Sequence, residues 1–281
     1  MPEVIVAKTA GFCFGVSRAV NMVFDETKKG DRVRTCGPIV HNETVIHELE
    51  EKGVSALESE ADFENVTGGT VVIRAHGIPE RIENRLREQG INVVDATCPF
   101  VKKIHNIVRD ANSRGRQVII VGDASHPEVQ GIFGRAAADT VIIDSFECFK
   151  SLNLPKDGKY SLVAQTTFNY EKLLEIIDNL QNLKYDIECF NTVCNATQER
   201  QKEAEEIASK VDAMIVIGSR NSSNTRKLYE ICSSKCKVTM LIQTMDDLTG
   251  EDFHSLNSVG ITAGASTPKH IIEEVQTYVR S

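Results

Sequence analysis

The sequence predicts an α/β protein made of three similar domains with mostly parallel sheets, arranged as a pseudo-threefold trefoil around a common centre. Two observations lead to this fold class. Short apolar runs alternate with longer segments of helical periodicity along the whole chain, which is typical of parallel sheets joined by helices. In addition, one pattern of cysteine, glycine and polar residues occurs three times with the same spacing.

The expected strands are short and apolar, as strands buried on both faces of a sheet are. They cover residues 4–7, 70–74, 91–94, 117–122, 140–144, 213–218 and 238–242. Two of the intervening polar and apolar segments, residues 198–210 and 267–279, have the periodicity of amphipathic helices. Each helix therefore leads from one buried strand towards the next.

The repeat begins at Cys13, Cys98 and Cys194. A glycine follows each cysteine after 24 residues, a His or Ser comes four residues later, and another polar residue comes two beyond that. These later positions are Gly37, His41 and Glu43, then Gly122, His126 and Glu128, and finally Gly218, Ser222 and Asn224. The repeat predicts three domains, at residues 1–97 with the C-terminal segment joined to it, 98–190 and 191–281.

A second polar group follows a later strand in each repeat. It consists of His76 in "RAHG", Thr166 and Thr167 in "AQTT", and Ser266 in "TAGAS". Ligands of parallel α/β sheets bind at the carboxyl ends of the strands. Cys98 itself lies between an apolar run and Pro99, which favours the first turn of a helix, so its thiol is expected at such an edge.

The composition excludes several classes of protein. The chain has 281 residues, 41% of them hydrophobic, and contains no apolar run of 18 residues and no basic leader before an apolar stretch. We therefore expect a soluble cytoplasmic protein without a membrane partner. Its net charge of −8, without a lysine- or arginine-rich tract, disfavours nucleic acid as a partner. None of the eight cysteines occurs in a CxxC pair, and we expect reduced thiols.

The repeated thiols allow more than one interpretation. Three cysteines could hold zinc with one open position, or an iron–sulfur cluster with one vacant iron site. The surrounding histidines, serines and Asn224 offer hydrogen bonds to a compact anion such as a diphosphate, and Glu128 is the expected proton donor. Alternatively, the histidines are structural and the Ser, Thr, Glu and Asn residues are helix caps. The other cysteines are expected to be small buried apolar residues: Cys36, Cys148, Cys189, Cys232 and Cys236.

Two other functions fit parts of this pattern. One is a thiol or zinc hydrolase, in which one cysteine is a nucleophile beside a histidine. The other is a sensor that uses an oxygen-sensitive cluster as a switch without turning over a substrate.

The ordered set of motifs resembles the 4-hydroxy-3-methylbut-2-enyl diphosphate reductase family of the non-mevalonate isoprenoid pathway. The motifs are "AGFCFGV", "GPIVHN", "RAHG", "DATCP", "GDASHPEVQG", "AQTT", "NTVCNAT", "SRNSSN" and "TAGAS", and they extend along essentially the whole chain. The resemblance implies a trefoil of three α/β domains around a central cluster. It also implies reductive dehydroxylation of an allylic diphosphate to isopentenyl diphosphate and dimethylallyl diphosphate.

The resemblance further implies a role for each motif residue. One 4Fe-4S cluster per chain would be held by Cys13, Cys98 and Cys194, with Glu128 delivering protons and Thr166 bonding the substrate alcohol. The substrate-binding residues would be His41, His76, His126, Thr167, Ser222, Ser223, Asn224 and Ser266. An external electron donor such as a ferredoxin or flavodoxin is implied, because the family carries no flavin or nicotinamide of its own.

Overall fold

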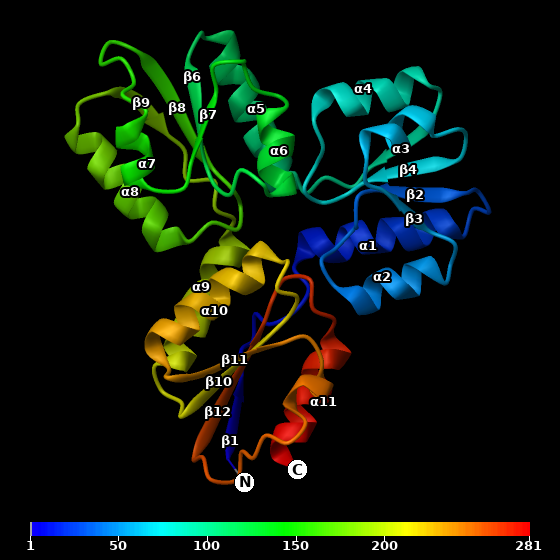
Figure 1. Cartoon of the computed structure of the whole chain (residues 1–281), viewed down its shortest axis with the longest axis vertical. Coiled ribbons are helices and arrows are strands. Elements are labelled where there is room, and N and C mark those ends of the chain that lie inside the picture. Colours follow the sequence, from blue (N-terminus) through cyan, green and yellow to red (C-terminus); the bar gives the residue numbers. More distant parts are fainter. Residues whose placement is uncertain (1) are drawn as a thin grey trace. The chain divides into compact units, whose positions relative to one another are not determined.

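The computed structural model describes residues 2–281, and over this range the chain forms three four-stranded sheets in which every strand pairing is parallel (Figure 1). The predicted α/β fold class with parallel sheets is thereby confirmed. The chain divides into two compact units. Unit 1 contains residues 1–17, 40–48 and 195–281, and unit 2 contains residues 18–39 and 49–194. No helix within residues 2–281 combines the length and the apolar character needed to span a bilayer.

Unit 1 holds one sheet with the order β1-β12-β10-β11. Its strands are β1 (Glu3–Val6), β10 (Ala213–Ile217), β11 (Val238–Ile242) and β12 (Ser258–Ala263). Its helices are α9 (Asn195–Ala208), α10 (Ser223–Lys235), α11 (Lys269–Arg280) and the short 3₁₀ helix η1 (Met245–Leu248). One apolar cluster joins the sheet to α9 and α10, and another joins it to α11, so both faces of the sheet are covered.

Unit 2 holds the other two sheets. The first has the order β3-β2-β4-β5, with β2 (Val33–Cys36), β3 (Ser55–Leu57), β4 (Thr70–Ile73) and β5 (Asn92–Asp95). Its helices are α3 (Glu60–Asn65), α4 (Glu80–Glu88) and most of α1 (Phe14–Thr27), whereas most of α2 (Glu43–Glu50) belongs to unit 1. The core here packs this sheet against α3 and α4.

The second sheet of unit 2 has the order β7-β6-β8-β9, with β6 (Gln117–Val121), β7 (Val141–Ile143), β8 (Lys159–Ala164) and β9 (Asp186–Cys189). Its helices are α5 (Pro99–Ser113), α6 (Pro127–Phe133), α7 (Phe146–Ser151) and α8 (Tyr170–Asn182). One apolar cluster includes α5 and α6, and another includes α7 and α8 (Figure 1). The two helix pairs thus cover opposite faces of the sheet.

The first strand pairs with a strand from the C-terminal part of the chain. The sequence analysis placed residues 4–7 in a first domain that the C-terminal segment joins, and β1 pairs with β12 in register from Glu3 with Ser258 to Val6 with Ile261. This pairing gives β1 the edge position that β5 and β9 occupy in the other two sheets. All three sheets therefore have the same order, and the N-terminal strand completes the sheet formed by the C-terminal part of the chain. The boundaries at residues 97 and 190 stay a prediction.

Candidate active site

Each of the three repeated cysteines follows the edge strand of a sheet and bonds to the same place on the neighbouring strand. The backbone N–H of Cys98, after β5, donates to the carbonyl of Ala75 at 2.9 Å. That of Cys194, after β9, donates to Thr166 at 3.1 Å, and that of Cys13, after β1, donates to Ala265 at 3.4 Å. All three side chains are partly exposed, and none of the eight cysteines forms a disulfide. The repeated spacing in the sequence thus corresponds to one repeated backbone position.

Cys98 lies on a strand-to-helix turn, as the sequence predicts. It is the N-cap residue of α5, and Pro99 occupies the first turn of the helix. The carbonyl of Cys98 accepts the first helical hydrogen bond, from the N–H of Lys102 at 2.9 Å, and the carbonyl of Cys13 accepts one from Ser17 at 2.9 Å. The thiols therefore lie beside the first turns of helices, where the backbone N–H groups and the positive dipole end point outwards.

The repeated glycine has a steric explanation in all three sheets. The N–H groups of Gly37, Gly122 and Gly218 each donate at 2.8 Å to the last residue of a neighbouring strand. A Cβ at these positions would lie 2.5 Å from Arg74 Nη1, 2.8 Å from Val129 Cγ2 and 2.6 Å from Thr225 Oγ1, respectively. Only glycine lets the chain turn here from the central strand towards the helix that carries the next polar residues.

Glu128 is almost completely buried, with 1% of its surface exposed, and lies in the first turn of α6. Its carboxyl group accepts two hydrogen bonds from Thr166, one from the backbone N–H at 2.6 Å and one from Oγ1 at 2.7 Å. Burial raises the pKa of Glu128 to about 7, although the two Thr166 hydrogen bonds lower it. A carboxyl group with such a pKa can hold a proton at neutral pH and release it.

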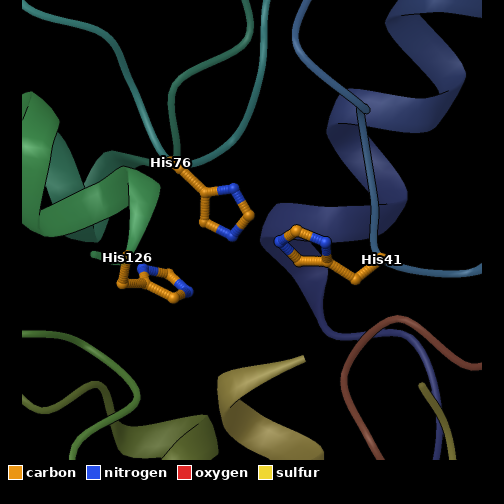
Figure 2. Close-up of side chains that lie close together, drawn as sticks. All are labelled: His41, His76 and His126. Atoms are coloured by element: carbon orange, nitrogen blue, oxygen red, sulfur yellow. The ribbon is translucent and has the colours of Figure 1, made fainter. Parts of the chain in front are cut away.

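His76 and His126 are brought together at the carboxyl ends of β4 and β6. Their ring centroids are 5.2 Å apart with an interplanar angle of 86°, an edge-to-face contact that Figure 2 shows. His126 also caps α6, because its Nδ1 accepts the N–H of Glu128 at 3.2 Å. This bond leaves Nε2 of His126 as the position that can carry a proton. His41, also labelled in Figure 2, precedes α2 and belongs to unit 1.

Thr167 follows Thr166 after β8 and is held by a residue that sequence reasoning did not single out. Gln165 donates through Nε2 to Thr167 Oγ1 at 2.9 Å, and its Oε1 accepts the N–H of Asp123 at 3.1 Å. Gln165 is buried, with 1% of its surface exposed. It thus ties the loop after β8 to the loop after β6, which leads to His126. The sequence signal for this role was the position of Gln165 in the "AQTT" motif, between a buried strand and Thr166.

In unit 1, the predicted polar residues gather at the start of α10 and after β12. Ser222 is the N-cap of α10, with its hydroxyl accepting the N–H of Thr225 at 3.4 Å, and Ser223 and Asn224 form the first turn. Asn224 Oδ1 accepts the N–H of Ala265 at 3.1 Å, which joins α10 to the loop after β12. In that loop, Ser266 donates through Oγ to the carbonyl of His41 at 3.3 Å.

A buried arginine that the sequence analysis missed supports this arrangement. Arg200, on α9, is 3% exposed. Its Nε donates to the carbonyl of Thr9 at 2.8 Å, its Nη2 to the carbonyl of Gly11 at 2.7 Å, and its Nη1 to Asn224 Oδ1 at 3.4 Å. Arg200 therefore holds the loop before Cys13 against the start of α10. A single arginine in a helical segment carries no local sequence signal for this role.

The remaining cysteines lie in or against apolar clusters. Cys36, Cys232 and Cys236 are buried, whereas Cys148 and Cys189 are half-buried against the core of the second sheet in unit 2. Burial raises the pKa of Cys36 and that of Cys232 to about 12. Such thiols are not ionised at neutral pH and are poor metal ligands.

Fold and site together define an α/β protein whose thiols and hydrogen-bonding side chains gather at the carboxyl ends of parallel sheets. A model of the LytB protein family matches residues 4–280, so the chain belongs to this family. The resemblance inferred from the motifs is thereby confirmed.

Known relatives span nearly the same length. A 4-hydroxy-3-methylbut-2-enyl diphosphate reductase from Caldanaerobacter subterraneus subsp. tengcongensis is 42% identical and aligns over 99% of this chain and 97% of its own. The protein of the same name from Geotalea uraniireducens is 44% identical over 97% of this chain and 95% of its own.

Two solved structures are similar along the whole chain. One is described as (E)-4-hydroxy-3-methyl-but-2-enyl diphosphate reductase, the terminal enzyme of the non-mevalonate pathway. It is 38% identical, with a TM-score of 0.71, and the match covers 100% of this chain and 99% of that one. The other is the E-1-hydroxy-2-methyl-but-2-enyl-4-diphosphate reductase from Plasmodium falciparum, 30% identical with a TM-score of 0.91 over 99% of this chain and 87% of that one.

Proposed function

We propose that this chain reduces 4-hydroxy-3-methylbut-2-enyl diphosphate to isopentenyl diphosphate and dimethylallyl diphosphate. The reaction breaks the allylic carbon–oxygen bond, takes up two electrons and two protons, and releases water. The relatives named above carry this activity in their names and align with nearly the full chain. The buried Glu128–Thr166 pair and the equivalent positions of Cys13, Cys98 and Cys194 support the proposal.

The observation that carries the proposal is the buried pair of Glu128 and Thr166. A departing hydroxide needs a proton, and a carboxyl group with a pKa of about 7 can supply one at neutral pH. Thr166 holds the carboxyl in one orientation through two hydrogen bonds, at 2.6 and 2.7 Å. Its hydroxyl is also the group that we propose to hydrogen-bond the substrate alcohol. Glu128 would then protonate the leaving oxygen.

We propose that Cys13, Cys98 and Cys194 hold one 4Fe-4S cluster per chain. The residues fit this group, because each thiol is partly exposed at the N-terminal end of a helix and occupies the equivalent backbone position after an edge strand. Three dispersed thiolates suit a cluster that keeps one iron open. When bound, the cluster supplies electrons and a Lewis-acidic iron. The arrangement of the sheets around it stays a prediction.

The diphosphate group would be bound by side chains that donate hydrogen bonds without permanent positive charge. The proposed set is His41, His76, His126, Thr167, Ser222, Ser223, Asn224 and Ser266. Ser223 and Asn224 begin α10, and His126 caps α6. Helix N-termini favour anions, because their backbone N–H groups and positive dipole ends point outwards.

Electrons would come from an external protein such as a ferredoxin or flavodoxin. Such a donor is implied because the family carries no flavin or nicotinamide of its own. An assay with a chemical reductant can measure the reductase activity without the natural electron donor being known.

The experiment is a measurement of iron and acid-labile sulfide on anaerobically purified protein, followed by an assay of the diphosphate substrate with reduced methyl viologen. We expect roughly four irons and four sulfides per chain. The bound iron and sulfide should be lost in Cys13→Ala, Cys98→Ala and Cys194→Ala. They should be retained in the matched control Cys148→Ala. A colourless protein that stays active without two of the three thiols would indicate a hydrolase. An intact cluster without substrate reduction would indicate a sensor.

A further inference from the structure

A cavity in unit 2 is lined by Gly77 and Pro127, the chain neighbours of His76 and His126, but neither histidine is part of its wall. Its volume is about 510 Å³, within the range of small-molecule sites. Most of its wall is apolar and comes from α3, α4, the first turn of α6 and the loops after β2 and β4. The residues that line the cavity include Cys36, Phe63, Arg74, Ile78 and Ile82.

Arg74 brings a positive charge to this wall without a matching acceptor. Its Nε is buried and has no hydrogen-bond partner among residues 2–281, which the structure describes. Burial lowers the pKa of Arg74, which means that the surroundings disfavour its charge. A partly buried guanidinium still requires acceptors for its buried N–H groups, because those groups have lost their hydration. The structure of the chain alone leaves this requirement unmet.

The acidic groups around the cavity do not meet the requirement either. Glu60 is committed to Arg81, from which it accepts two hydrogen bonds, one of them at 3.0 Å. Glu58 lines the cavity but is exposed to solvent, and it makes no side-chain hydrogen bond to Arg74 in the described part of the chain. With Arg81 and Glu60 paired, Arg74 is the cation of the cavity that has no hydrogen-bonded counterion.

The backbone is shaped to admit the guanidinium at this position. Gly37, at the end of β2, has φ +69°, and a Cβ there would lie 2.5 Å from Arg74 Nη1. Glycine therefore keeps open the space in which the charged group lies. The backbone carbonyl of Arg74 accepts a hydrogen bond from the N–H of Gly77 at 3.0 Å, which fixes the turn after β4.

We propose that this cavity is a binding site for a small organic monoanion with an apolar body, whose headgroup accepts hydrogen bonds from Arg74. Guanidinium groups bind carboxylates and phosphates through paired N–H donors. One unneutralised cation suits a single negative charge, and the exposed carboxylate of Glu58 disfavours a headgroup of higher charge. Phe63, Ile78 and Ile82 provide the apolar surface for the rest of the ligand. The proposal does not depend on the proposed reductase activity.

The test uses the holoenzyme and three probes: n-hexanoate, the monoanionic diester n-hexyl methyl phosphate, and n-hexanol. Binding is measured by isothermal titration calorimetry to the unmodified protein, to Arg74→Gln and to the control Arg81→Gln. We expect at least one anionic probe to bind at least tenfold more tightly than n-hexanol. Arg74→Gln should lose at least tenfold in affinity for that probe, and Arg81→Gln should keep it. Which anion binds better distinguishes a carboxylate source from a phosphate source.

Three results would overturn the proposal. These are no binding of either anion to the unmodified protein, equal binding by Arg74→Gln, and loss of binding in His41→Ala, which would place the probe in the proposed substrate site. A second measurement excludes a merely structural role for the arginine. Because the guanidinium lacks acceptors, Arg74→Met should raise the thermal midpoint of the protein without probe by about 2 °C or more. A lower midpoint would show that Arg74 stabilises the fold by itself.

Discussion

The two carboxyl oxygens of Glu128 each accept a hydrogen bond from Thr166, at 2.6 Å from the backbone N–H and at 2.7 Å from the hydroxyl. The two residues are far apart in sequence and come from the starts of different connections, after β6 and β8. Burial and hydrogen bonding act in opposite directions on the pKa of Glu128, and burial is the larger effect. The same loop also bonds Cys194, because the carbonyl of Thr166 accepts its N–H at 3.1 Å. The proposed proton donor and one proposed cluster ligand are therefore linked through one residue.

Glu128→Gln should abolish most of the turnover while leaving the cluster and substrate binding intact. The amide has nearly the same shape as the carboxyl group but cannot donate a proton as an acid. We expect kcat to fall at least 100-fold, in line with the contribution of a general acid, with little change in iron content and in substrate Kd. Steady-state kinetics with reduced methyl viologen, together with equilibrium binding, would measure both. Unchanged kcat would remove Glu128 from the reaction.

The stability of the folded protein should depend on pH through Glu128. Its pKa is raised from an ordinary 4.5 to about 7, so between these values the folded state binds more protons than the unfolded state. The stabilising contribution is thus fully present below pH 4.5 and is lost as the pH rises through 7. Relative to Glu128→Gln, the free energy of unfolding should fall by up to about 3 kcal/mol between pH 4.5 and pH 8. Urea denaturation of both proteins across this pH range tests whether the free energy of unfolding falls as the pH rises.

Thr166→Val should move the pH dependence of turnover. In the native protein, the 2.7 Å hydrogen bond from Thr166 Oγ1 lowers the pKa of Glu128. The substitution removes this bond and keeps the one from the backbone N–H. The pKa of Glu128 should therefore rise, and the alkaline limb of the kcat profile should shift to higher pH while kcat itself decreases. Thr167→Val is the matched control, because the Thr167 hydroxyl accepts a hydrogen bond from Gln165. The alkaline limb of the kcat profile should stay in place in this variant. Identical profiles for the two variants would contradict the assignment.

His126→Ala should lose both substrate affinity and stability, and His126→Asn can separate the two effects. Alanine removes the cap that accepts the Glu128 N–H at 3.2 Å, which costs about 1 kcal/mol, whereas asparagine is a good N-cap. We expect KM to rise at least tenfold in both variants, and the free energy of unfolding to fall only in the alanine variant. A KM that recovers in His126→Asn would limit His126 to a structural role.

Arg200→Lys should disturb cluster assembly from a position outside the proposed ligands. An ammonium group cannot reproduce the three hydrogen bonds to Thr9, Gly11 and Asn224. The buried partners would be left unsatisfied, and we expect a loss of about 3 kcal/mol in stability and reduced iron content. Lys202→Gln, an exposed position on the same helix, is the control. Normal iron content in Arg200→Lys would show that the loop before Cys13 is held by other contacts.

Much of the fold followed from local patterns in the chain. The run "AMIVI" is buried along its whole length in β10, as expected for a central strand of a parallel sheet. The repeated cysteine and glycine positions also predicted the equivalent places in the three sheets, because each is set by short-range geometry. The strand at residues 238–242 has the expected boundaries, whereas the helix expected at 198–210 covers Asn195–Ala208.

The sequence by itself determined the α/β class, the threefold repetition and the residue types at the ends of the strands, since periodicity, turn glycines and helix starts depend on near neighbours. Only the tertiary structure decided which strands share a sheet and which side chains meet. It placed β1 beside β12, although the two strands lie at opposite ends of the chain. It also paired Glu128 with Thr166 and, within residues 2–281, left the buried Nε of Arg74 without an acceptor. These relationships depend on burial and on contacts between distant segments, which no local pattern encodes.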